Sequence, residues 1–136
     1  MLSYNDLIVS SSDAEVLATL VGGRRMGGVE AEAANALADT LLEARMVADH
    51  RLPGDRVAMN ARVSYREEPG GNRRTVALVH PAQADASAGS ISVLSPVGRA
   101  LLGLKRGSTA AIELPGGRAL TLRVLEVERP ALKEAA

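Results

Sequence analysis

The stretch 91-ISVLSPVGRALLGLKRG-107 decides the fold that we expect for this chain. It begins as a short strand. Ser95 is a favoured helix N-cap, and Pro96 suits the first helical position, where its missing N–H removes no intrahelical hydrogen bond. Apolar residues then recur at helical spacing, at Val97, Leu101 and Leu104. Gly98 and Gly103 lower the helix propensity, so we expect this short helix to lie flat on a sheet and to take its stability from packing.

Segments on both sides of this stretch have the patterns of strands. From Val57 to Tyr65 every second residue is apolar, which predicts a strand with one buried face. Thr75–His80 is apolar on both faces, and we expect it to be central. Further strands are predicted at Thr109–Leu114 and Ala119–Glu128, joined by a Pro-Gly-Gly turn. The apolar phase of the last strand shifts, which predicts a β-bulge at Val124–Leu125.

The first third of the chain predicts two helices. An apolar run, Leu7–Val9, could dock the N-terminus onto the body of the protein. Ser12 and Glu15 then have the spacing of a capping box, and a helix of about three turns follows. After a glycine-rich link, the residues from Val29 to Asp49 predict the longest helix, with one face rich in alanine. Two helices joined by a short link form an antiparallel hairpin.

Together these elements predict an α+β fold. Residues 1–52 would form a short, coiled-coil-like helical hairpin, and residues 53–136 an antiparallel sheet packed on one short helix. The chain of 136 residues is 46% apolar but contains two Tyr and no Phe or Trp, so its core must be aliphatic. A platform of stacked aromatics for nucleic acid is therefore excluded. The 16 basic and 16 acidic residues cancel, which favours a protein partner over nucleic acid.

Several other kinds of site lack the residues that they need. The chain has no cysteine, and neither His50 nor His80 has metal ligands at a suitable spacing, so we expect no metal and no cofactor. Both Pro-Gly-Gly sequences lack the remainder of a phosphate-binding loop, and we expect no small-molecule substrate. No apolar run approaches the length of a membrane span and no signal peptide is visible, so we expect a cytoplasmic protein without membrane contact.

The chain resembles a known family. The quoted stretch, with MNARVSY before it and LTLRVLEVE after the Pro-Gly-Gly turn, resembles the C-terminal FKBP-like domain of the bacterial Gre transcript-cleavage factors. With its short N-terminal hairpin the whole chain is similar to the Rnk branch, whose members are known as regulators of nucleoside diphosphate kinase. The resemblance implies binding to RNA polymerase. In such factors the globular domain grips the rim of the secondary channel and the hairpin enters the channel.

The resemblance also assigns the partner-binding residues. The family contacts polymerase through the Ser-Pro step and the residue before it, which are Ser95, Pro96 and Leu94 in this chain. Gre factors often carry an acid at the position of Leu94, so one charged contact is in question. Arg99 could supply a different polar contact, and a solvated surface arginine is an equal alternative. The simplest explanation of Ser95 is that it only begins the helix.

The hairpin tip departs from the Gre pattern. Gre factors carry acidic residues there, which help to hold a metal ion for RNA cleavage, whereas the tip expected here contains Arg24 and Arg25. Glu30 and Glu32 lie two residues apart on a helix and would point to different faces. We therefore expect a protein that competes with longer factors without cleaving RNA. Arg24 and Arg25 are either solvated or in contact with polymerase or nucleic acid in the transcription complex.

Two other functions are alternatives to polymerase binding. The FKBP-like fold suggests a prolyl isomerase, but active isomerases enclose proline in an aromatic pocket, and the only aromatics here are Tyr4 and Tyr65. The name of the similar branch suggests a regulator of nucleoside diphosphate kinase or of nucleotide pools, acting through another protein partner. We expect a non-enzymatic protein, and the sequence leaves the kinase alternative open.

Overall fold

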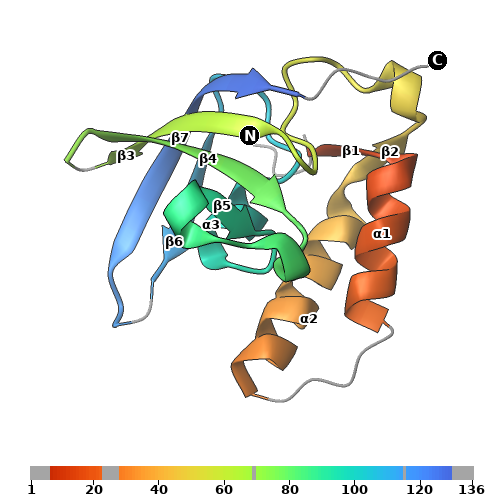
Figure 1. Cartoon of the computed structure of the whole chain (residues 1–136), viewed down its shortest axis with the longest axis horizontal. Coiled ribbons are helices and arrows are strands. Elements are labelled where there is room, and N and C mark those ends of the chain that lie inside the picture. The colour runs from red at the N-terminus through yellow and green to blue at the C-terminus, as the bar shows by residue number, and fades with distance from the viewer. Residues whose placement is uncertain (1–6, 23–27, 69, 115, 130–136) are drawn as a thin grey trace.

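The computed structural model of the protein describes residues 7–22, 28–68, 70–114 and 116–129 (Figure 1). Its helices are α1 (Ser11–Gly22), α2 (Gly28–Glu43) and α3 (Pro96–Leu101). Its strands are β1 (Ile8–Ser10), β2 (Arg45–Val47), β3 (Arg62–Glu68), β4 (Asn72–Val79), β5 (Ser90–Ser92), β6 (Thr109–Glu113) and β7 (Ala119–Glu128). Short 3-10 helices lie at Asp49–Arg51, Pro81–Gln83 and Ala86–Ala88. The arrangement is α+β, as predicted.

The main sheet has five strands in the order β5-β4-β3-β7-β6. The pairs β3–β4, β3–β7 and β6–β7 are antiparallel, as predicted. Strand β5, however, pairs with β4 in parallel, because the chain between them crosses over through two 3-10 helices instead of making a hairpin. The sheet is therefore mixed. Strand β4, which contains the segment expected to be central, lies inside the sheet, while β3 occupies its middle. The FKBP-like classification stays a prediction.

The predicted β-bulge is confirmed. Ser64 on β3 lies opposite Glu126 on β7, and the next residue, Tyr65, lies opposite Val124. Leu125 is therefore the extra residue of the bulged strand. The bulge returns an apolar side chain to the buried face after the phase shift, because Leu120, Leu122 and Val124 are buried before it and Val127, after it, packs partly buried against the core.

The strand expected to begin at Val57 begins at Arg62 instead. Between them the backbone is irregular, with a positive φ of 70° at Asn60. The Val57 N–H donates to the Leu104 carbonyl (2.9 Å) in the loop after α3. The Asn60 N–H donates to the Leu78 carbonyl of β4 (2.6 Å), but the regular β3–β4 ladder begins only at Arg62. The alternation of apolar residues that suggested a strand reflects burial in this segment and not strand pairing.

The long helix is shorter than predicted. Helix α2 ends at Glu43, and the chain then forms β2, which pairs in parallel with β1. The Arg45 N–H donates to the Leu7 carbonyl at 2.8 Å, so tertiary pairing with the N-terminal run takes over from the helix. Docking of that run is confirmed. His50 consequently lies in a 3-10 helix and not at the end of α2. Helices α1 and α2 stand side by side below the β1–β2 pair (Figure 1).

Helix α1 is capped by a different residue from the one predicted. The Ser10 hydroxyl accepts a hydrogen bond from the Asp13 N–H at 3.1 Å, so Ser10 and not Ser12 performs the capping. Ser12 lies inside the helix, where its N–H and its hydroxyl both donate to the Asp49 carboxylate. Glu15 is exposed. The capping-box spacing of Ser12 and Glu15 is therefore coincidental.

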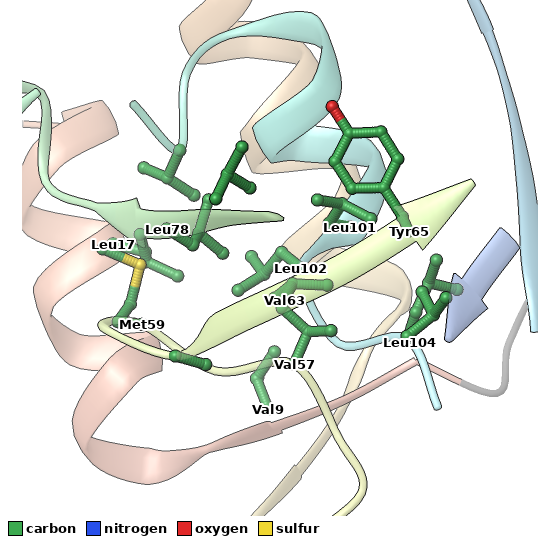
Figure 2. Packing of buried hydrophobic residues seen from close by; sticks show 14 of the residues in the cluster. Val9, Leu17, Val57, Met59, Val63, Tyr65, Leu78, Leu101, Leu102 and Leu104 are labelled. Carbon is green, nitrogen blue, oxygen red and sulfur yellow. The ribbon is translucent and has the colours of Figure 1, made fainter. Parts of the chain in front are cut away.

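Buried side chains from the hairpin and from the sheet belong to one hydrophobic cluster. It combines residues of α1 and α2 with residues of the main sheet and α3, which include Leu17, Leu37, Val63, Leu78 and Leu101. Figure 2 shows Tyr65 beside Leu101 in this core. Tyr65 is only 3% exposed, so it cannot line an open proline pocket, and Tyr4 lies outside the described residues.

Candidate partner-binding site at the Leu94–Arg99 turn

The turn that leads from β5 into α3 is held by Ser92. The Ser92 carbonyl accepts hydrogen bonds from the N–H of Ser95 (3.0 Å) and from the Ser95 hydroxyl (2.7 Å). The Ser92 hydroxyl in turn accepts a hydrogen bond from the Leu94 N–H at 2.9 Å. A strand that ends in serine and is followed three residues later by a second serine can close such a turn locally. The role of Ser92 is not evident from the sequence, where Ser95 and Pro96 alone signal the start of the helix.

Ser95 is the N-cap of α3, as predicted. Its hydroxyl oxygen accepts a hydrogen bond from the Gly98 N–H at 3.0 Å, and Pro96 occupies the start of the helix. A hydroxyl has one proton, and that proton is already donated to the Ser92 carbonyl. Ser95 can therefore meet a partner through its shape and its remaining lone pair, but not as a hydrogen-bond donor.

Arg99 holds the same turn from the helix side. Its Nη1 donates to the Leu94 carbonyl at 2.5 Å, and the side chain is partly buried. Burial lowers the pKa of the Arg99 guanidinium, because removing water disfavours the charged form. A guanidinium nevertheless remains charged at neutral pH. Arg99 is therefore not a freely solvated surface arginine, because its guanidinium contacts the carbonyl of its own turn. The polar contact with a partner stays a prediction.

Gly98 allows α3 to lie directly against the end of β5. A Cβ atom at this position would stand 2.2 Å from the Ser92 carbonyl oxygen and 3.0 Å from the Val93 Cα. Both are backbone atoms, which cannot rotate away as a side chain can. Sequence analysis noted only the low helix propensity of Gly98. The glycine in fact fixes the position of the turn on the sheet.

The structure brings the four predicted contact residues together. Leu94, Ser95, Pro96 and Arg99 are each partly exposed, and hydrogen bonds within the turn fix their relative positions. A surface that is already ordered loses little conformational entropy when a partner binds. The turn is thus suited to rigid docking. Arg24 and Arg25, the residues predicted at the hairpin tip, lie outside the described residues.

A second polar contact, which the sequence gave no reason to single out, joins α1 to the segment before β3. The Asp13 carboxylate accepts a hydrogen bond from the Met59 N–H at 3.0 Å. Burial raises the pKa of Asp13, although the hydrogen bond from Met59 acts in the opposite direction. Asp13 also lies in the first turn of α1, where a carboxylate is favoured by the positive end of the helix. Its partner is 46 residues away in the chain, and no local pattern predicts that contact.

Asp49 gives α1 a cap from outside the helix. Its carboxylate accepts hydrogen bonds from the Ser12 hydroxyl and, at 3.0 Å, from the Ser12 N–H. These hydrogen bonds lower the pKa of Asp49, because they stabilise the ionised carboxylate. Asp49 therefore caps α1 from 37 residues away in the chain.

We predict losses of stability of different size for two substitutions of Asp13. Asp13→Ala should lower the free energy of unfolding by about 1 to 3 kcal/mol, because the buried Met59 N–H loses its acceptor. Asp13→Asn keeps an oxygen acceptor and removes a charge whose burial is unfavourable, so it should change stability by about 1 kcal/mol or less at neutral pH. Denaturant unfolding monitored by circular dichroism measures both values. Equal losses in the two variants would contradict the role of the hydrogen bond.

The pH dependence follows from the raised pKa of Asp13. As the pH falls towards the ordinary value of 3.8, the folded protein takes up this proton before the unfolded chain does. Protonation therefore favours the folded state, and this contribution is lost as the pH rises through the folded pKa. The stability of the wild type relative to Asp13→Asn should increase as the pH is lowered from neutral, and a decrease would contradict the assignment.

No metal site is evident in the part of the chain that the structure describes. Within those residues, no three His, Asp or Glu side chains gather so that they could hold a metal ion. None of the described helices is long and apolar enough to cross a lipid bilayer.

Comparison with known proteins places this turn within a family. Residues 52–129, which contain the main sheet and α3, match the family described as "Transcription elongation factor, GreA/GreB, C-term". The chain belongs to this GreA/GreB family. The predicted resemblance is confirmed.

Proteins of related sequence match different lengths of this chain. The chain is 40% identical over 128 residues to "Regulator of nucleoside diphosphate kinase" from Escherichia coli (strain K12), a match that covers 93% of this chain and 92% of that protein. It is 45% identical over 67 residues to transcription elongation factor GreA from Desulfovibrio desulfuricans, which covers 49% of this chain and 41% of that factor.

A solved structure shares the GreA/GreB fold of the whole chain. The structure titled "Prokaryotic transcription elongation factor GreA/GreB from Nitrosomonas europaea" superposes with a TM-score of 0.71 at 35% identity. The match covers 90% of this chain and 98% of that one. The helical hairpin and the sheet domain thus recur together in a protein of nearly the same extent.

Proposed function

We propose that this protein is a non-enzymatic regulator of transcription that binds RNA polymerase at the rim of the secondary channel. The ordered turn of Leu94, Ser95, Pro96 and Arg99 is the proposed contact surface. The observation that carries the proposal is the hydrogen-bonded Ser-Pro turn within a GreA/GreB family domain. In this proposal Arg99 is a positioning residue, because its guanidinium holds the Leu94 carbonyl.

The matched proteins support a function in transcription. The family description and the names of the GreA relatives refer to transcription elongation. Relatives of that kind bind polymerase according to the resemblance described above, and this chain retains the Ser-Pro step of their contact surface. Its Leu94 replaces the acid that Gre factors often carry, so we expect an apolar contact in place of a charged one.

The short hairpin supports the proposal that the protein competes with Gre factors for polymerase without stimulating transcript cleavage. At about 1.5 Å per residue, the 12 residues of α1 span about 18 Å and the 16 residues of α2 about 24 Å. Helix α2 is thus shorter than the sequence had predicted, and the paired part of the hairpin is short. The predicted tip is basic, and it offers no acidic pair for a metal ion. Such a hairpin would occupy the channel entrance without delivering catalytic carboxylates.

Binding and cleavage can be tested in one set of experiments. We predict that the purified protein binds core RNA polymerase, that a Gre factor displaces it, and that it does not stimulate transcript cleavage in stalled elongation complexes. Fluorescence anisotropy of the labelled protein measures binding and displacement, and gel analysis of labelled transcripts measures cleavage. A Gre factor is the positive control for cleavage. Binding that no Gre factor displaces, or cleavage at stoichiometric protein, would contradict the proposal.

A second candidate is regulation of nucleoside diphosphate kinase through direct contact. It is favoured by the 40% identity to a protein of that name over nearly the whole of both chains. The structure offers no reason to prefer it over polymerase binding. Affinity capture from a bacterial lysate separates the two, because recovery of the kinase without polymerase would favour the second candidate. Recovery of polymerase without the kinase would favour the first.

A further inference from the structure

Three arginines stand in register across neighbouring strands on the exposed face of the main sheet. Arg66 on β3 lies directly opposite Arg73 on β4 and also directly opposite Arg123 on β7. All three side chains are exposed. Val63 and Tyr65 on β3 are buried in the core, and alternate residues of a strand point to opposite faces, so Arg66 points away from the core and from α3. We call Arg66, Arg73 and Arg123 the arginine row.

The arginine row is largely unpaired within the described residues. There, neither Arg66 nor Arg73 contacts a carboxylate, and Arg123 makes a long ion pair with Glu68, with 3.7 Å between Nε and the carboxylate oxygen. Both side chains of that pair are substantially exposed, so water screens it. Arg62 and Arg66, which alternate along this face of β3, are both exposed, so no described element covers the arginine row.

Such an arrangement is unfavourable for the isolated sheet. Like charges directly opposite each other on neighbouring strands destabilise a sheet. Next to the arginine row, the hydroxyls of Ser64 and Thr75 lie opposite each other at 2.9 Å. The exposed face therefore presents three guanidinium groups beside two hydroxyls, a surface rich in hydrogen-bond donors. Guanidinium groups bind carboxylates in a bidentate manner, so an anionic partner would relieve the repulsion.

We propose that this face of the sheet binds an acidic protein segment whose carboxylates lie across Arg73, Arg66 and Arg123. This surface is distinct from the Leu94–Arg99 turn, because α3 packs on the opposite face of the sheet. It serves a second partner, or a second segment of the same partner. Binding of an acidic segment to this face does not depend on the proposed function of the turn.

The surroundings of the arginine row favour protein over nucleic acid as the partner. Glu126 lies opposite Ser64, and Glu128 lies opposite Arg62, so the face becomes acidic towards one end. The chain as a whole carries no net charge. A long phosphate backbone would meet these carboxylates, whereas a short acidic segment spans only the three arginines. Bases would also find no exposed aromatic side chain of β3 to stack on, since its tyrosine is buried.

The proposal can be tested with a synthetic peptide of alternating Glu and Ser. Titration of the isotope-labelled full chain at low salt should shift backbone amide resonances of β3, β4 and β7 around the arginine row. The double variant Arg66→Thr/Arg73→Thr should bind the peptide on the order of tenfold more weakly, because two guanidinium contacts are lost. The control Arg45→Thr/Arg51→Thr removes the same charge from exposed positions outside the main sheet, and it should retain wild-type affinity within about twofold.

The melting temperatures of the same variants provide a second test. Arg66→Thr/Arg73→Thr should melt at the same temperature as the wild type or higher, because repulsion is relieved and threonine is favourable in strands. A lower affinity is then not a consequence of unfolding. Equal weakening in the control variant would overturn the proposal, because it would show an effect of net charge alone. Tighter binding of a single-stranded RNA oligonucleotide than of the peptide at this face would also overturn it.

Discussion

Replacing Gly98 with alanine should destabilise the protein by about 3 kcal/mol, at the upper end of the usual range for overpacking. The added Cβ would lie 2.2 Å from the Ser92 carbonyl oxygen, so α3 must move away from the end of β5. That movement would also lengthen the hydrogen bond between the Ser95 hydroxyl and the Ser92 carbonyl. Domains are stable by only about 5 to 15 kcal/mol, and a fall in melting temperature of roughly 10 °C is expected.

Gly54 offers a matched control for the Gly98 variant. It has no atom within 4 Å of an added Cβ, and its φ is not positive. Gly54→Ala should therefore change stability by no more than about 1 kcal/mol, and restriction of the unfolded chain favours a small increase. Thermal unfolding monitored by circular dichroism measures both variants. If Gly98→Ala melts at the temperature of Gly54→Ala, the close approach of α3 to β5 is not as described.

Local patterns in the sequence predicted local features well. The phase shift after Val124 predicted the bulge at Leu125, because burial on one face fixes which residues must alternate. Ser95 and Pro96 predicted the start of α3, because capping depends on residues within one helical turn. The position and the capping of this turn could therefore be outlined from the sequence, while its role as a contact surface is what the family resemblance implies and stays a prediction.

Features that depend on distant contacts could not be predicted in this way. The residues after Glu43 have good helix propensity, yet they pair with β1, which lies more than thirty residues away. The apolar alternation after Val57 resembles a strand, yet the backbone there bonds to the Asp13 carboxylate and to the loop after α3. Propensity and periodicity describe single segments, so they do not show which segment will supply the hydrogen-bond partner.

The position of Arg99 shows the same limit at the candidate site. The helical stripe correctly placed Arg99 away from Leu101 and the core, but spacing alone does not show that its guanidinium returns to the Leu94 carbonyl. Every residue has a backbone carbonyl, so the sequence does not indicate which carbonyl a side chain will contact. The contact changes the interpretation of the site, because Arg99 becomes a residue that shapes the surface that Leu94, Ser95 and Pro96 present.

Substituting Ser95 with glutamate should weaken binding to core RNA polymerase on the order of a hundredfold, if the turn docks as proposed, because an unpaired charge would be buried at the interface. Ser95→Ala is the matched control. Both variants remove the hydroxyl that accepts the Gly98 N–H, so each should lose about 1 kcal/mol of stability, but only glutamate adds charge and bulk.

Comparison of the two variants separates the capping role of Ser95 from partner contact. Ser95→Ala should bind polymerase within about threefold of the wild type, since a cap can be lost while the packing of α3 on the core persists. Titration of labelled variants with core polymerase measures the affinities, and chemical denaturation measures their stabilities. If the wild type binds polymerase and both variants bind equally well, Ser95 serves only as a helix cap. The polymerase contact would then have to lie on another surface of the protein.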